Sequence, residues 1–128
     1  MIVVLFSYSL RADADVQAED AATDRMWSIV SRMPGFISYK SYTAEDGETI
    51  AVVRFESREA LEAWKYRSEH REIQERARVE WFEDYWVQAS ESFREYRHMR
   101  EAGYEQPIPH NVFLRGSRPA VPAEAPAP

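Results

Sequence analysis

The sequence predicts a single α+β domain built on a four-stranded antiparallel sheet with its helices on one face. Residues 2–10 and 79–96 have strand composition, and residues 36–56 have the pattern of a hairpin. Helical periodicity occupies the two intervals between these stretches. The resulting order, β-α-β-β-α-β, is the split ferredoxin-like arrangement. A chain of 128 residues, 45% of them hydrophobic, is large enough for one packed core.

The first strand and the first helix have clear patterns. Residues 2–10 are a continuous apolar run rich in β-branched and aromatic residues, which suits a strand buried on both faces. From about Val16, apolar side chains fall on one helical stripe: Ala22, Met26, Ile29, Val30 and Met33. Pro34 and Gly35 end this helix, because proline disfavours helical geometry in the residue before it and glycine accepts left-handed dihedral angles.

The middle of the chain predicts a hairpin followed by a broken helix. Residues 36–43 and 48–56 are the two strands, and Asp46-Gly47 between them has turn chemistry. Ser57 can cap the second helix, with Trp64 on its apolar face. The pattern changes after Tyr66, and we expect Ser68 to cap a separate helix that runs to about residue 78 and is largely solvated.

The last strand and the C-terminal extension differ sharply in composition. Residues 79–96 carry aromatic side chains on both parities, Trp81 and Tyr85 on one and Phe82 and Trp86 on the other. We place the domain at residues 1–98 and an extension at 99–128. Six of the seven prolines fall in the extension, and its Pro/Ala-rich end is expected to be disordered.

A sheet covered by helices on one face leaves the other face in need of a partner. Apolar residues occupy both parities of the strands, as Leu5 and Phe6 illustrate, so the uncovered face is also apolar. At about 25 cal/mol per Å², burying roughly 600 Å² would contribute on the order of 15 kcal/mol before association entropy is subtracted. The sequence therefore predicts a homodimer through the sheet face.

Composition limits the partners. The formal net charge of -6 does not favour binding to the phosphate backbone of DNA or RNA, so nucleic acid is not an expected partner. The chain has no cysteine, which excludes disulfides and thiolate metal sites, and no two histidines have metal-ligand spacing. Without a basic leader or an apolar run of about 20 residues, we expect a cytoplasmic protein that does not enter a membrane.

Residues 64–70 are the candidate pocket wall. Trp64, Tyr66, Arg67 and His70 bring an indole donor, a phenol, a guanidinium and an imidazole into seven residues. A solvated helix does not require this mixture. The structural alternatives are that Trp64 is a core residue and that His70 is a surface histidine.

Several short motifs add a resemblance to a known family: Pro34-Gly35-Phe36, the run Phe55-Glu56-Ser57-Arg58-Glu59-Ala60, Trp64, Ser68-Glu69-His70 and the aromatic last strand. Over about residues 1–96 the chain resembles the antibiotic biosynthesis monooxygenase domain. The resemblance implies a dimeric α+β barrel with a pocket between sheet and helices in each subunit. That family includes cofactor-independent oxygenases that convert polycyclic phenols into quinones, haem-degrading oxygenases, and domains without an assigned reaction.

The chemistry of such a pocket assigns roles to the candidate residues. A deprotonated phenol, anthrone or quinol can itself give an electron to O2, so the protein need supply only a base, a donor for the oxyanion and a dry cavity. We expect His70 to be the base and Trp64 the donor. Tyr66 or Arg67 could hold a phenolate, and the remaining substrate-binding candidates are Tyr8 and Trp81. No cofactor or metal is then required.

Two alternatives stay open. A haem-binding or haem-degrading protein would use His70 as an iron ligand, but haem-degrading relatives carry an asparagine on the first strand, and the only asparagine here is Asn111. A non-catalytic dimeric module that binds a small aromatic ligand would need no reaction at all.

Overall fold

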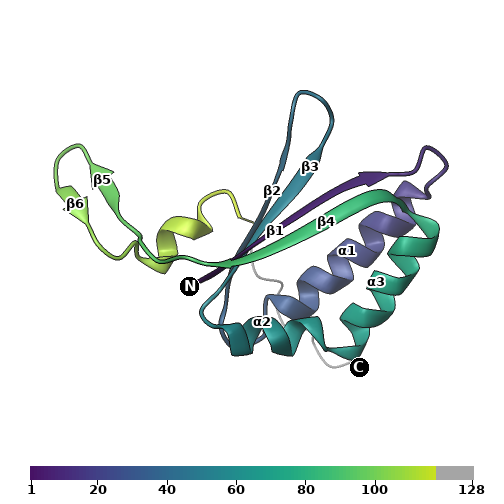
Figure 1. Ribbon diagram of the computed structural model, residues 1–128, viewed down its shortest axis with the longest axis horizontal. Coiled ribbons are helices and arrows are strands. Elements are labelled where there is room, and N and C mark those ends of the chain that lie inside the picture. Colours follow the sequence, from purple (N-terminus) through teal and green to yellow (C-terminus); the bar gives the residue numbers. More distant parts are fainter. Residues whose placement is uncertain (118–128) are drawn as a thin grey trace, which may run out of the picture.

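The structure, a computed structural model, describes residues 1–117. The elements are β1 (Ile2–Leu10), α1 (Val16–Val30), β2 (Phe36–Thr43), β3 (Thr49–Phe55), α2 (Arg58–Lys65), α3 (Ser68–Glu80), β4 (Phe82–Glu91), β5 (Arg97–Met99), β6 (Gly103–Glu105) and the 3-10 helix η1 (His110–Leu114). The first four strands form one antiparallel sheet in the order β2-β3-β1-β4. All three α-helices lie on one side of it (Figure 1), which confirms the predicted fold class.

Side-chain caps set the starts of the first two helices. The Asp15 carboxylate accepts the Ala18 amide at 3.1 Å, and the Ser57 hydroxyl accepts the Ala60 amide at 3.2 Å. The predicted break between α2 and α3 is confirmed. The predicted Ser68 cap is wrong: Arg67 occupies the N-cap of α3 without a side-chain bond, because the Ser68 hydroxyl bonds the Glu69 carboxylate at 3.2 Å instead.

Gly35 lets the chain pass closely beneath α2. Its φ is +83°, in the left-handed region, and a Cβ built on it would lie 2.6 Å from Cβ of Ala60. The Gly35 carbonyl also accepts the Glu56 amide at 2.7 Å, which ties the start of β2 to the end of β3. No larger residue fits both requirements.

The core between sheet and helices has two clusters. The larger joins Ile2, Val4, Trp27, Val30 and Phe55, from β1, α1 and β3. The second joins Ala22 of α1 to Ala77 and Trp81 at the end of α3. Together they fix α1 and α3 against the sheet, and α2 packs over the first cluster through Leu61 and Trp64.

The final strand begins later than the sequence indicated. Helix α3 continues through Glu80, and the Trp81 amide donates to the Ala77 carbonyl, so β4 starts at Phe82 rather than at residue 79. Trp81 is consequently a helix C-cap residue with 3% of its surface exposed, and not a strand residue. Strand composition in residues 79–81 misled the prediction, because packing of the α3 terminus against α1 outweighs it.

The extension is ordered as far as the structure describes it. The expected boundary at residue 98 falls inside β5, which pairs with β6. Helix η1 then returns to the sheet: the Arg54 guanidinium lies over the Phe113 ring at 4.3 Å. The Ser117 hydroxyl accepts the amide of Tyr39 at 3.2 Å and donates to its carbonyl at 2.6 Å. The expected disorder concerns residues 118–128, which lie outside the described residues.

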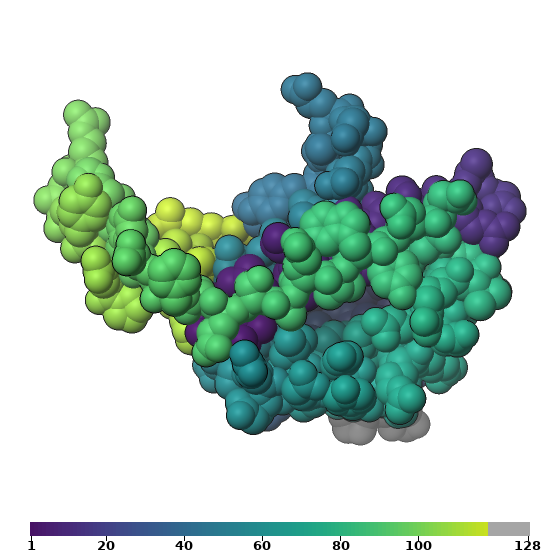
Figure 2. All heavy atoms as spheres, in the orientation of Figure 1, coloured from purple at the N-terminus to yellow at the C-terminus, as the bar shows by residue number. Residues whose placement is uncertain are grey.

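The face of the sheet opposite the helices is termed here the open face. Because Ile2 and Val4 face the helices, Leu5 and its ladder partners Val52 and Gln88 face the other way. The pair Ser7 and Trp86 lies on the same face, and Trp86 is 39% exposed. Figure 2 shows this face as a saddle between the β2–β3 hairpin and the β5–β6 hairpin. Within residues 1–117, none of the helices has the length and apolarity to cross a bilayer.

Candidate functional site

The junction of α2 and α3 brings together two of the predicted site residues. Trp64 comes from the last turn of α2 and His70 from the first turn of α3. Their rings stack with centroids 4.3 Å apart and an interplanar angle of 27°. This arrangement, called the Trp64–His70 stack below, exists because the helix breaks between the two residues.

His70 is held neutral by its surroundings. Burial lowers the pKa of its imidazole, because the charged form loses solvation. The carbonyls of Lys65 and Trp64 oppose this shift, yet neither forms a well-aligned hydrogen bond to Nδ1. Nδ1 is buried and has no hydrogen-bond partner among the described residues. Because Nδ1 is enclosed by protein, a proton taken from a substrate would have to go to Nε2 of the neutral imidazole.

Trp64 also has a structural role. Its side chain packs against the larger core cluster, which contains Ile2, Val4 and Phe55. The core alternative foreseen for this residue is therefore correct in part: one side of the indole supports the core and the other carries His70. Such packing fixes the orientation of the imidazole.

Tyr66 and Arg67 do not join the stack. Tyr66 is 61% exposed, and Lys65 lies over its ring with Nζ 5.3 Å from the centroid. The Arg67 side chain pairs with the Glu69 carboxylate at 3.0 Å on the surface. Both residues occupy the connection between α2 and α3, where the Tyr66 side chain contacts Lys65 and the Arg67 side chain pairs with Glu69.

Tyr8 and Trp81 lie elsewhere in the layer between sheet and helices. The Tyr8 ring stacks on Phe6 and on Phe82, with centroids 5.3 Å away in both cases. Trp81 is buried in the second core cluster, with the Arg76 guanidinium 4.7 Å from its ring centroid. Trp81 therefore packs the core, and Tyr8 belongs to an aromatic group under β1 and β4.

Glu19 is a buried acid that sequence reasoning missed. Only 8% of its surface is exposed, and its carboxylate accepts the Thr23 hydroxyl at 3.1 Å. Burial raises the pKa of Glu19, and nearby Asp20 raises it further. Burial, followed by the charges of Tyr39, Glu19 and Asp20, raises the pKa of Tyr8 to about 12. An acidic residue at the start of an amphipathic helix is normally exposed to solvent. The sequence therefore contains no indication that Glu19 is buried.

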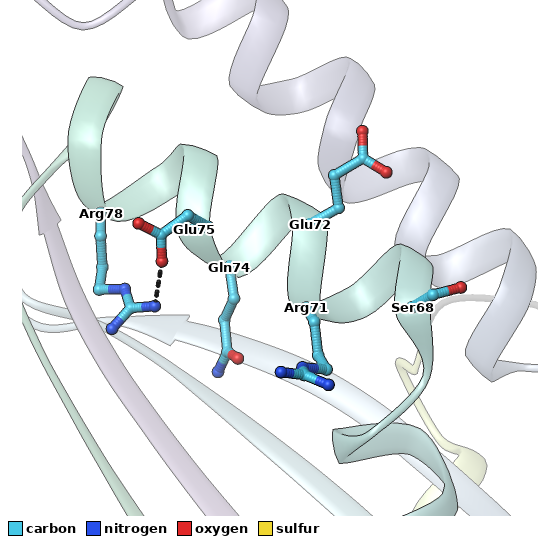
Figure 3. Close-up of a pocket in the computed structure, with 6 residues that line it drawn as sticks. All are labelled: Ser68, Arg71, Glu72, Gln74, Glu75 and Arg78. Carbon is cyan, nitrogen blue, oxygen red and sulfur yellow. Dashed lines mark hydrogen bonds and ion pairs between the residues drawn. The ribbon is translucent and has the colours of Figure 1, made fainter.

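Two surface hollows lie outside the stack. One of about 420 Å³ follows α3 (Figure 3), where Arg71, Gln74 and Arg78 project from one side of the helix and Glu72 from the other. The second, of about 280 Å³, lies at the end of the open face and is lined by Ser7, Tyr8, Ser9, Asp46, Gly47, Glu48, Asp84 and Trp86. Neither hollow is lined by Trp64 or His70. Residues 1–117 contain no group of three histidine or acidic side chains placed to hold a metal ion.

Comparison with known sequences identifies relatives for the domain. A family model described as antibiotic biosynthesis monooxygenase matches residues 1–76. The uncharacterized protein YqjZ of Bacillus subtilis (strain 168) is 32% identical over 92 residues, which are 72% of this chain and 79% of that protein. Both matches include α2, and the family match extends across the Trp64–His70 stack into α3.

Solved structures share the fold at low identity. Rv0793 from Mycobacterium tuberculosis has a TM-score of 0.64 and 23% identity, covering 73% of this chain and 96% of that one. SnoaB from Streptomyces nogalater, described as a cofactor-independent oxygenase, has a TM-score of 0.60 and 10% identity, covering 72% and 92%. At these identities the likeness supports the fold alone.

Proposed function

The chain belongs to the antibiotic biosynthesis monooxygenase family, and from this premise we propose that it is a cofactor-independent monooxygenase that oxidises a small planar phenol, anthrone or quinol with O2. The observation that supports this most directly is the Trp64–His70 stack. It places an imidazole, whose pKa is lowered by burial and which is therefore neutral near pH 7, directly against an indole. A base and a donor on adjacent aromatic planes suit a flat, ionisable substrate.

The proposed reaction is balanced without a cofactor. For an anthrone, the methylene carbon and O2 become a carbonyl and water: CH2 + O2 → C=O + H2O. His70 takes the proton whose loss makes the substrate electron-rich, and the anion passes one electron to O2. The resulting radical pair combines to a peroxide anion at the methylene carbon, the imidazolium of His70 returns its proton to this peroxide, and loss of water leaves the ketone. The Trp64 N–H donates a hydrogen bond to the substrate oxygen or the peroxide.

We further propose that the active form is a homodimer through the open face. Trp86 at 39% and Tyr42 at 50% exposed are large apolar side chains on this face, which the α-helices do not cover. Helix η1 packs on the same face beside Arg54, the ladder partner of Val3. Leu5 and Val52 extend the apolar strip across the central strands. A second copy packed on this strip would complete the barrel of the family.

Oxygen uptake with a model hydroxyanthrone tests the reaction. The wild-type protein, treated with a chelator, should consume O2 above the autoxidation rate, and His70→Ala should lose at least about 100-fold, the usual contribution of a general base. Trp64→Phe should also lose activity. His110→Ala is the matched control, because His110 lies in η1 with about half of its side chain exposed. Equal rates in His70→Ala and the control would contradict the proposal.

The same preparations discriminate the other two functions. A haem protein would develop a Soret band with haemin that His70→Ala removes. A non-catalytic binder would show a ligand-dependent rise in melting temperature with a panel of planar phenols and no O2 uptake with any of them.

A further inference from the structure

A hairpin arm projects from the end of the sheet. The arm comprises residues 92–106, in which β5 and β6 pair with each other and lie beyond the body of the domain (Figure 1). The Arg97–Glu105 ion pair at 2.6 Å holds the two strands together. Tyr104 makes edge contacts with Tyr96 and His98, at centroid distances of 6.1 and 5.0 Å. Since a lone two-stranded hairpin is marginally stable in water, packing against another surface would stabilise it.

The arm exposes a larger apolar area than a monomeric protein normally leaves in contact with water. Phe93 is 92% exposed, Tyr104 is 73% exposed and Tyr96 is 54% exposed. A buried aromatic residue removes about 150–250 Å² from water, so these three would remove roughly 500 Å². An aromatic group of this size on a projecting element is typical of a protein contact.

The hollow at the far end of the open face has the complementary charge. Asp46, Glu48 and Asp84 line it beside Trp86. None of the three carboxylates forms an ion pair with a residue that the structure describes. At the turn of the arm, exposed Arg100 is likewise without an ion pair in the described part of the chain. The arm thus offers a cation and aromatic rings, and the hollow offers carboxylates and an indole.

The arm cannot easily reach the hollow of its own chain. Asp84 lies near the start of β4, while the arm leaves the end of this strand at Glu91. Seven residues of strand at about 3.3 Å each separate the two points by about 23 Å, and the arm continues away from the sheet. Figure 2 shows the saddle between the arm and the β2–β3 hairpin, with the yellow segment that contains η1 lying in it next to the arm.

We infer that the arm of each copy packs across the open face of a second copy, with Phe93 and Tyr104 on the partner sheet and Arg100 in the partner's acidic hollow. This inference rests on the homodimer proposed above. A twofold axis forms the contact twice, so two arms meet two faces and no surface is left to extend the assembly. Two arms would add roughly 1,000 Å² from their aromatic residues alone, most of what a stable interface of about 1,600 Å² requires.

Charge reversal in the full-length chain tests the pairing by sedimentation velocity. The dimer Kd should rise at least 10-fold in Arg100→Glu and in Asp84→Arg. The double variant R100E/D84R should return to within about 3-fold of wild type, because the exchanged charges meet again across the interface. Phe93→Ser should also raise the Kd at least 10-fold. Arg78→Glu is the control: Arg78 lies on α3, paired with Glu75, and should leave the Kd unchanged.

The possible outcomes distinguish the proposed arm contact from the proposed sheet-face dimer. If the wild-type chain dimerises and neither Arg100→Glu nor Phe93→Ser weakens it, the arm contact is refuted while the sheet-face dimer stands. If both single charge reversals weaken the dimer but the double variant does not recover, the Arg100 pairing is refuted. A wild-type chain that stays monomeric at micromolar concentration overturns both. The oxygen-uptake result bears on none of these.

Discussion

Replacing His70 with phenylalanine should stabilise the protein and abolish the proposed oxygenase activity. The substitution keeps a ring on Trp64, where the present centroids are 4.3 Å apart, and removes Nδ1, a buried polar atom without a partner. An unsatisfied buried polar group costs about 1–3 kcal/mol, which the substitution would recover. Packing the slightly larger phenyl ring offsets part of this stabilisation. We expect a net rise of about 1 kcal/mol in the free energy of unfolding at pH 7.

The stabilising effect of His70→Phe relative to wild type should be larger at acidic pH. Because burial lowers the pKa of folded His70 below its unfolded value of 6.5, the unfolded chain binds the proton more tightly. Above pH 6.5 the imidazole is neutral in both states, and stability is lost as the pH falls from 6.5 through the folded pKa. The His70→Phe variant has no imidazole to protonate, so it should not lose stability in this way.

Urea unfolding at several pH values between 5 and 8, followed by tryptophan fluorescence, measures both effects. His70→Ala serves as the comparison, since it removes the stacked ring as well and should be less stable than wild type. A His70→Phe variant that is less stable than wild type at pH 7, or whose advantage does not change with pH, would refute the description of His70 as a buried neutral base.

Two further substitutions test the fold. Glu19→Gln should raise the free energy of unfolding at pH 7 by about 1 kcal/mol, because it removes a buried charge and keeps an acceptor for Thr23. Since the folded pKa of Glu19 is raised above 4.5, its cost appears as pH rises through that folded pKa; unfolding curves of wild type and variant should therefore converge in acid, and parallel pH profiles would contradict this. Gly35→Ala should destabilise by at least about 2 kcal/mol in thermal unfolding, through its positive φ and the clash with Ala60, and a neutral outcome would refute the close approach.

Local sequence patterns were sufficient for the elements of the domain. The apolar stripe that begins at Ala22 placed α1, although the helix ends at Val30, before the predicted stop at Pro34-Gly35. The change of pattern after Tyr66 placed the break before α3. That break is what brings His70 onto Trp64, so the pairing of these two residues follows from a feature visible in the sequence.

Long-range packing decided what the sequence left open. Residues 79–81 have strand composition, yet contacts of Trp81 with Ala22 and Ala77 hold them in and next to α3. Glu19 is typical of a solvated first turn, and only the position of α1 over the sheet buries it. Strands β5 and β6 form a sheet of their own and contribute no residue to either core cluster, so no periodicity toward a core could reveal them.

The direct test of a cofactor-free monooxygenase is isotope incorporation. Chelator-treated, haem-free protein is given a hydroxyanthrone under ¹⁸O2, and the quinone is analysed by mass spectrometry. We expect one ¹⁸O atom in the newly formed carbonyl group at the enzymatic rate, with the incorporation lost in His70→Ala. Product formation that ceases after chelation, or a new carbonyl oxygen that comes from water, would contradict the proposed chemistry.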